Sequence, residues 1–164
     1  MTAGRASRRS GANLPRVIES RWNDDQAREF IARYAGDGGE DLALRVYSSR
    51  LLGADRSLVL HGGGNTSVKT TLPDPATAEP TRVLCVKGSD ADLDSIEPAG
   101  LPALRLDALL KLRGRPRLTD EAMVDAVRAQ LLRPSAPTPS VETLLHAFLH
   151  IASSTTRTPT RCCC

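Results

Sequence analysis

The sequence predicts an α/β fold in which helices cover both sides of a sheet. Segments with helical apolar spacing alternate along the chain with short strand-like runs, and no segment repeats. The 164 residues, of which 40% are apolar, are enough for one domain with its own core. Because aromatic residues make up only 3% of the chain, we expect a core of leucine, valine and alanine.

Two helices are predicted first. The first begins at Asn23, which is a good N-cap followed by acidic residues, and it ends at Gly36. The second begins at Glu40 and ends at Gly53, in the usual position of a C-terminal glycine.

Strands follow these helices. The apolar run 57–61, the glycine-rich turn 62–65 and the run 66–71 together predict a hairpin. A polar loop at 73–80 then leads to a buried strand at 82–86.

The remaining elements are mostly helical. Residues 101–113 predict a short strand or turn and then a helix, and 119–132 have the spacing of an amphipathic helix. A proline-rich linker at 134–139 introduces a last helix at 140–149. Four apolar side chains of this helix are expected to form one face that needs a partner: Leu144, Leu145, Phe148 and Leu149.

We divide the chain into three parts. Residues 1–21 form a basic arm that we expect to be disordered, 22–149 form the folded part, and 150–164 form a tail without periodicity or core residues. The net charge is only +3, and no aromatic residue lies among the arginines of the arm, which argues against nucleic-acid binding. No apolar run is long enough to span a membrane, so we expect a cytoplasmic protein.

The first motif with chemical potential is the run 62–67, Gly-Gly-Gly-Asn-Thr-Ser. Glycines allow positive φ angles and let a ligand approach the backbone, so successive N–H groups can bind an anion. Asn65 and Ser67 can add side-chain hydrogen bonds. The alternative interpretation is a plain hairpin turn.

The second motif is Lys87-Gly88-Ser89, at the end of a predicted buried strand. A lysine, a glycine N–H and a hydroxyl at a strand end suit a phosphate, whereas Asp90 would repel one. The alternative is a surface turn with a solvated lysine.

The third motif joins Ser140, Glu142 and His146. Ser140 is a good N-cap, and the helix dipole favours Glu142 in the first turn. Glu142 and His146 share a helix face, so the imidazole could hold a carboxylate that transfers protons. A half-buried histidine with satisfied hydrogen bonds explains His146 equally well.

In this order and spacing, the motifs resemble the class II aldolase and adducin family. The most similar members are the aldolase parts of long bacterial proteins that join a rhamnulose-1-phosphate aldolase to a short-chain dehydrogenase. The resemblance covers roughly residues 20–149 and implies the N-terminal part of a three-layer α/β/α sandwich, incomplete in this chain. Its strongest segments are 40–47, 58–70, 84–89, 96–100 and 139–149.

The resemblance also implies roles for individual residues. Gly64, Asn65 and Ser89 would bind the phosphate of the substrate, and Ser140 would contribute to the same pocket. Glu142 would be the acid/base that moves a proton as an enediolate forms. Asp90 departs from the family pattern, because most members have a glycine there.

The resemblance implies that the protein cleaves a phosphorylated ketose between C3 and C4, with zinc as a Lewis acid. It also implies a homo-oligomer. The substrate of this subgroup is a phosphorylated deoxyketose, which gives dihydroxyacetone phosphate and lactaldehyde. Zinc is held in the family by a His-x-His pair and a later histidine. The three histidines of this chain, His61, His146 and His150, do not make that pair, so we expect no zinc binding and little activity.

The tail suggests why the pair is missing. Back-translated and read one base earlier, residues 150–163 can give a string that contains His-Thr-His, as expected for a frameshifted or misread gene. The loss of later strands would expose the sheet edge and lower solubility. Two other functions remain open at this point: an adducin-like interaction module without catalysis, and epimerase, isomerase or dehydratase chemistry on the same plan.

Overall fold

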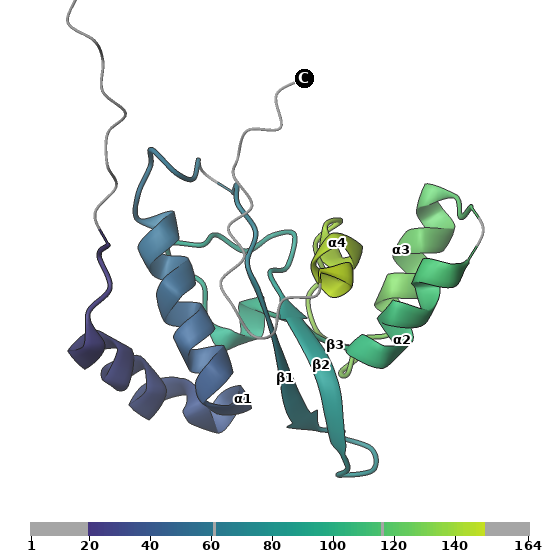
Figure 1. Cartoon of the computed structure of the whole chain (residues 1–164), viewed down its shortest axis with the longest axis horizontal. Coiled ribbons are helices and arrows are strands. Elements are labelled where there is room, and N and C mark those ends of the chain that lie inside the picture. Colours follow the sequence, from purple (N-terminus) through teal and green to yellow (C-terminus); the bar gives the residue numbers. More distant parts are fainter. Residues whose placement is uncertain (1–19, 61, 116, 150–164) are drawn as a thin grey trace, which may run out of the picture.

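A computed structural model describes residues 20–60, 62–115 and 117–149 of the chain (Figure 1). Its three strands form one antiparallel sheet in the order β1-β2-β3. Helix α1 lies on one side of the sheet, and α2, α3 and α4 lie on the other (Figure 1). The predicted α/β fold with helices on both sides is therefore confirmed.

Helix α1 spans Asp24–Gly53 and contains both predicted helices. It begins where predicted, since the Asn23 side chain accepts hydrogen bonds from two backbone N–H groups of the first turn. Gly38 and Gly39 leave the helical conformation, and Gly39 has a φ of 84°, which favours glycine. The helix bends there, so its second half runs beside β1 (Figure 1).

Strands β1 (Ser67–Pro73) and β2 (Pro80–Val86) form a hairpin other than the predicted one, and the predicted polar loop joins them. The predicted strand at 57–61 is wrong for residues 57–60, which form a turn after α1, and His61 lies outside the described residues. Asp55 explains the difference: its carbonyl accepts the N–H groups of Leu58 and Val59, and its carboxylate accepts that of Ser57. These N–H groups are then not available for strand pairing.

Residues 101–113 form the predicted short strand and helix, whereas the last two predicted helices are shorter than expected. Residues 130–132 leave the helix because their backbone bonds to β3, for example from Leu132 N–H to Ala103 carbonyl. Ser140 lies before the last helix, since its N–H donates to the Lys87 carbonyl. The observed bounds are β3 Ala103–Arg105, α2 Leu106–Lys111, α3 Asp120–Arg128 and α4 Thr143–Phe148, with 3-10 turns η1 at Pro98–Gly100 and η2 at Leu112–Gly114.

The core consists of two apolar clusters, one on each face of the sheet. Successive β2 residues alternate between them, with Val83 and Cys85 facing α1, and Leu84 and Val86 facing α2, α3 and α4. All four of these side chains are fully buried. The sheet is thus a middle layer between two helical layers.

The predicted apolar face of α4 is only partly correct. Leu144 and Phe148 pack against the core, but Leu145 and Leu149 are 54% and 37% exposed. The buried side chains include His146 instead, because the facing side chains of β1 are polar. Among the described residues, no helix is long and apolar enough to cross a membrane.

Candidate functional site

The glycine-rich loop connects α1 to β1, so its interpretation as a plain hairpin turn is wrong. Gly62 and Gly64 have φ angles of 69° and 72°, which favour glycine. A Cβ atom on Gly64 would lie 2.9 Å from the Leu93 side chain, and the Gly62 N–H donates to the Asp92 carboxylate over 2.6 Å. The loop is thus fixed against the segment that follows β2.

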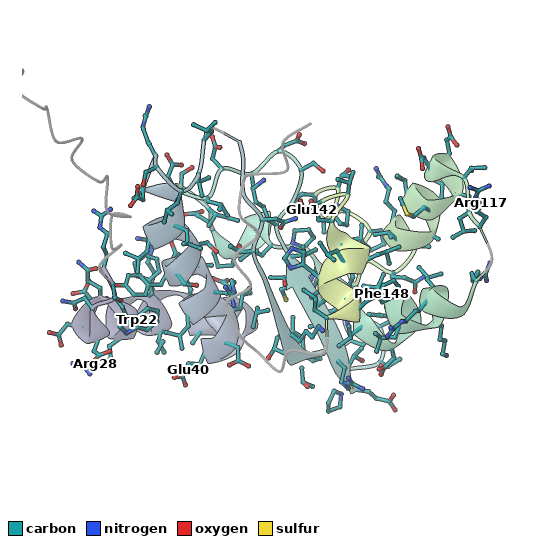
Figure 2. The ribbon with its side chains drawn as sticks, turned by 45° about the horizontal axis from the view of Figure 1, so that its top comes forward. Trp22, Arg28, Glu40, Arg117, Glu142 and Phe148 are labelled. Carbon is teal, nitrogen blue, oxygen red and sulfur yellow. The ribbon has the colours of Figure 1, made fainter. Side chains whose placement is uncertain are left out.

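A side-chain hydrogen bond joins this loop to the start of α4. Asn65 is only 4% exposed, and its Nδ2 atom donates to Ser140 Oγ over 2.7 Å. The same Ser140 Oγ accepts the backbone N–H of Glu142 over 3.3 Å. The buried Oδ1 atom of Asn65 has no hydrogen-bond partner within the described part of the chain. One serine therefore ties the loop to the turn that carries Glu142. Figure 2 shows Glu142 at the start of α4.

Ser89 bonds to the segment that leads to Ser140. Its N–H donates to the Thr138 carbonyl over 3.0 Å, and its Oγ donates to the Pro139 carbonyl over 3.3 Å. Ser89 and Asp90 are both exposed. The fold thus brings together all the site residues that the sequence singled out, at one end of β1 and β2: Gly64, Asn65, Ser89, Ser140 and Glu142.

Lys87 is buried, with 4% exposure, so its interpretation as a solvated surface lysine is wrong. Burial lowers the pKa of Lys87, while the negative charges of Asp92, Glu142 and Asp90 oppose that shift. Its side chain donates to the Gly88 carbonyl over 3.3 Å. A cation therefore lies inside the cluster, close enough to Glu142 for their charges to interact.

His146 is more buried than either sequence interpretation requires, at 2% exposure. Its Nδ1 atom lies 2.8 Å from Ser67 Oγ. Burial lowers the pKa of His146, the charges of Arg45 and Lys69 lower it further, and that of Glu142 raises it. The imidazole is thus held against β1 by Ser67, a partner that sequence reasoning missed although Ser67 stands in the first motif.

A profile of the class II aldolase and adducin N-terminal domain matches residues 44–164, which is most of the chain. The chain belongs to the class II aldolase and adducin family. The matched range includes the glycine-rich loop and the turn that carries Glu142. It extends into residues 150–164, which lie outside the described residues.

Two similar proteins show how much of a longer chain this class II aldolase domain corresponds to. A curated protein of Bacillus subtilis (strain 168), "Uncharacterized oxidoreductase YuxG", is 38% identical over 133 residues, which are 81% of this chain and 18% of that protein. A solved N-terminal class II aldolase domain from Thermoplasma acidophilum is 49% identical, with a TM-score of 0.63, and the match covers 67% of this chain and 51% of that one. The chain thus spans about half of the solved domain and a fifth of the curated relative.

Class II aldolases are generally zinc-dependent, so we asked whether the side chains fit a zinc ion. Within the described ranges, no group of three or more His, Cys, Asp or Glu side chains could hold a metal. The described donors therefore do not fit a zinc site, which needs at least three protein ligands. His61, His150 and Cys162 to Cys164 lie outside the described residues.

A cavity of about 890 Å³ lies away from this cluster. It is bordered by the bend of α1, the last residues of β1 and the residues next to β3. None of the site residues named above lines it. The cavity and the cluster are therefore two separate places on this class II aldolase domain.

Proposed function

We propose that this chain supplies the phosphate-binding and proton-transfer side of an aldolase site that acts on a phosphorylated deoxyketose. Gly64, Asn65, Ser89 and Ser140 are proposed to bind the phosphate end, and Glu142 to act as the acid/base. Membership of the class II aldolase and adducin family supports the reaction class. The observation that carries the proposal is the hydrogen bond from Asn65 to Ser140, which joins the two groups of residues.

Two features suit a phosphorylated ketose at this cluster. The ammonium of Lys87 lies close enough to Glu142 for their charges to interact, and its positive charge favours a phosphate. The buried carboxamide oxygen of Asn65, which has no partner among the described residues, can accept a hydrogen bond from a substrate hydroxyl. Asp90 opposes phosphate binding, so we expect modest affinity.

The proposed reaction breaks the C3–C4 bond of the ketose 1-phosphate. The C4 hydroxyl is proposed to give its proton to Glu142, the electron pair of the C3–C4 bond passes to the enediolate of dihydroxyacetone phosphate, and C4 becomes the aldehyde carbon of lactaldehyde. Glu142 is half-buried beside Ser140, and it is proposed to give the proton that C3 receives. In the reverse direction, the same carboxylate would remove that proton.

We further propose that this chain alone turns over little substrate. Its three histidines, His61, His146 and His150, do not form a His-x-His pair, the usual start of the zinc site in this family. The name of the curated relative, an oxidoreductase of which this chain matches 18%, supports our inference that the chain corresponds to the aldolase part of a longer aldolase and dehydrogenase protein. We expect the intact protein to be a cytoplasmic homo-oligomer.

Calorimetric titration with dihydroxyacetone phosphate tests the binding half of this proposal. We expect the unmodified chain and the Glu142→Gln variant to bind it, and the Asn65→Ala variant to bind it at least tenfold more weakly. Gln130→Ala removes a carboxamide just after the C-terminal end of α3 and serves as the matched control. Binding that is absent from the unmodified chain, or unchanged in Asn65→Ala, would refute the proposed site.

An aldol-cleavage assay with rhamnulose 1-phosphate, combined with a zinc titration, tests the catalytic half. We expect neither tight stoichiometric zinc binding nor measurable turnover by this chain. Turnover that depends on zinc would overturn the low-activity proposal, and the loss of that turnover in Glu142→Gln would still support the role of Glu142.

A further inference from the structure

Arg45 is a buried cation whose charge is not compensated by any described residue. Its side chain is 4% exposed, and its Nε and Nη1 atoms have no hydrogen-bond partner in the described part of the chain. None of the ion pairs found within the described ranges includes it. Burial lowers the pKa of Arg45 to about 10, which still leaves the group charged at neutral pH.

The position of Arg45 follows from its neighbours one turn away on α1. Asp41 accepts a hydrogen bond from Thr70 of β1, and Ser49 lies 2.7 Å from Thr66, just before β1. Arg45 is midway between them on the same helix face, so it lies alongside the first residues of β1, near Val68. Among the described strands, β1 pairs only with β2, so its other edge has no strand partner in the described part of the chain.

Two more basic groups lie across the same edge. Lys69 of β1 donates to the Ala147 carbonyl over 3.0 Å, and His146 contacts Ser67. The charges of Arg45 and Lys69 both act on His146, so the three groups share one electrostatic environment. Taking an ionised group out of water is costly unless an opposite charge and hydrogen bonds compensate. The buried Nε and Nη1 donors of Arg45 are therefore unsatisfied groups of this region among the described residues.

We infer that Arg45 forms a carboxylate-binding site at the edge of β1 that faces away from β2, between α1 and α4. A carboxylate suits it because its two oxygens can accept two guanidinium N–H groups at once and neutralise the charge. The carboxylate can come from a free ligand or from the chain itself. In the second case Glu19 is the source, because it is the one acidic side chain in the sequence outside the described residues. The residues that bind phosphate in the proposed function are not part of this site.

Sodium acetate is the probe, compared with sodium chloride at equal ionic strength in thermal unfolding of the full chain. We expect acetate to raise the unfolding midpoint saturably, by about 3 °C at ten times its dissociation constant. Arg45→Met should abolish the response and should itself raise the midpoint in chloride, since it removes a desolvated charge but keeps the volume. Arg28→Met, which removes an exposed arginine from the same helix, should leave the acetate response unchanged.

The Nε resonance of Arg45 in nitrogen-15 NMR gives a second readout that does not depend on whether Arg45→Met folds. It should shift saturably with acetate, and Arg45→Lys assigns it. Glu19→Gln identifies the source: if Glu19 fills the site, this variant lowers the midpoint and gains an acetate response that the unmodified chain lacks.

The carboxylate site is supported if the unmodified chain responds to acetate, and also if only the Glu19→Gln variant does. An acetate response that persists in Arg45→Met refutes it. The absence of any response in both the unmodified chain and Glu19→Gln also refutes it.

Discussion

Strands β1 and β2 are neighbours in one sheet, but the side chains of β2 are mostly apolar and buried, whereas those of β1 are mostly polar and form hydrogen bonds. Both faces of β2 are apolar, and its residues 83–86 are completely buried. Most side chains of β1 are polar, and they bond to a different helix on each face: Thr70 to α1, and Ser67 and Lys69 to α4. The central strand β2 therefore contributes buried apolar side chains to the core. The side chains of β1 form the hydrogen bonds that hold the sheet to α1 and α4 next to the candidate site.

The first way to break this comparison is to remove burial from β2. Leu84→Ala should destabilise the chain by about 3 kcal/mol, because the fully buried side chain leaves a cavity between the sheet and α2. Urea denaturation measures the change. Leu145→Ala on the exposed side of α4 is the control and should cost less than about 0.5 kcal/mol. Equal effects in the two variants would contradict the central role of β2.

The second prediction concerns the residue that leads into β1. Asn65→Ala should destabilise the chain by about 1–2 kcal/mol, since it removes a buried hydrogen bond to Ser140. The matched Gln130→Ala variant removes a partly buried carboxamide that bonds only within α3 and its C-terminal turn, and it should cost less. Chemical denaturation of the two variants under one condition provides the measurement. A larger loss in Gln130→Ala would mean that the loop and α4 are held together by other contacts.

Two apolar segments, 82–86 and 57–60, show what the sequence could and could not predict about the strands. Residues 82–86 predict β2 because a continuous apolar run between turns is typical of a buried strand. Residues 57–60 have a similar apolar pattern but form no strand, since Asp55 accepts the N–H groups of residues 57–59. Local hydropathy cannot distinguish these cases, because the difference lies in one carboxylate and one carbonyl upstream.

For the candidate site, too, the sequence could predict some features and not others. The motifs around Asn65, Ser89 and Glu142 could be found from residue types and resemblance. Their association through Ser140 Oγ depends on a contact between residues that are 75 positions apart in the sequence. Arg45 carried no sequence signal, because an arginine in the middle of a helix is ordinarily exposed. Only its position beside β1 shows that it is buried.

The third prediction concerns pH and the contact between β1 and α4. The folded-state pKa of His146 is lowered, so the unfolded chain binds a proton more readily than the folded chain does. The stabilisation should be fully present above the unfolded pKa of about 6.5 and should be lost progressively as the pH falls below it. Urea denaturation at several pH values measures this. His146→Gln should show a smaller loss, and His61 and His150 remain as internal controls in both proteins.

The fourth prediction is the smallest. Thr70→Val removes an exposed hydrogen bond to Asp41 on the α1 side of β1 and should change stability by less than about 0.5 kcal/mol. The same denaturation assay measures it. A loss as large as that of Asn65→Ala would show that β1 is held mainly through α1 and not through the loop and α4.

The central claim is that Asn65 and Ser140 join the glycine-rich loop to the Glu142 turn as one substrate-binding unit. Amide NMR of the chain during titration with dihydroxyacetone phosphate tests it most directly. We predict saturable shifts, with one common dissociation constant, for Gly64, Asn65, Ser89, Ser140 and Glu142. Shifts confined to the cavity at the bend of α1, or shifts of the loop and of the Glu142 turn with unrelated dissociation constants, would contradict the claim.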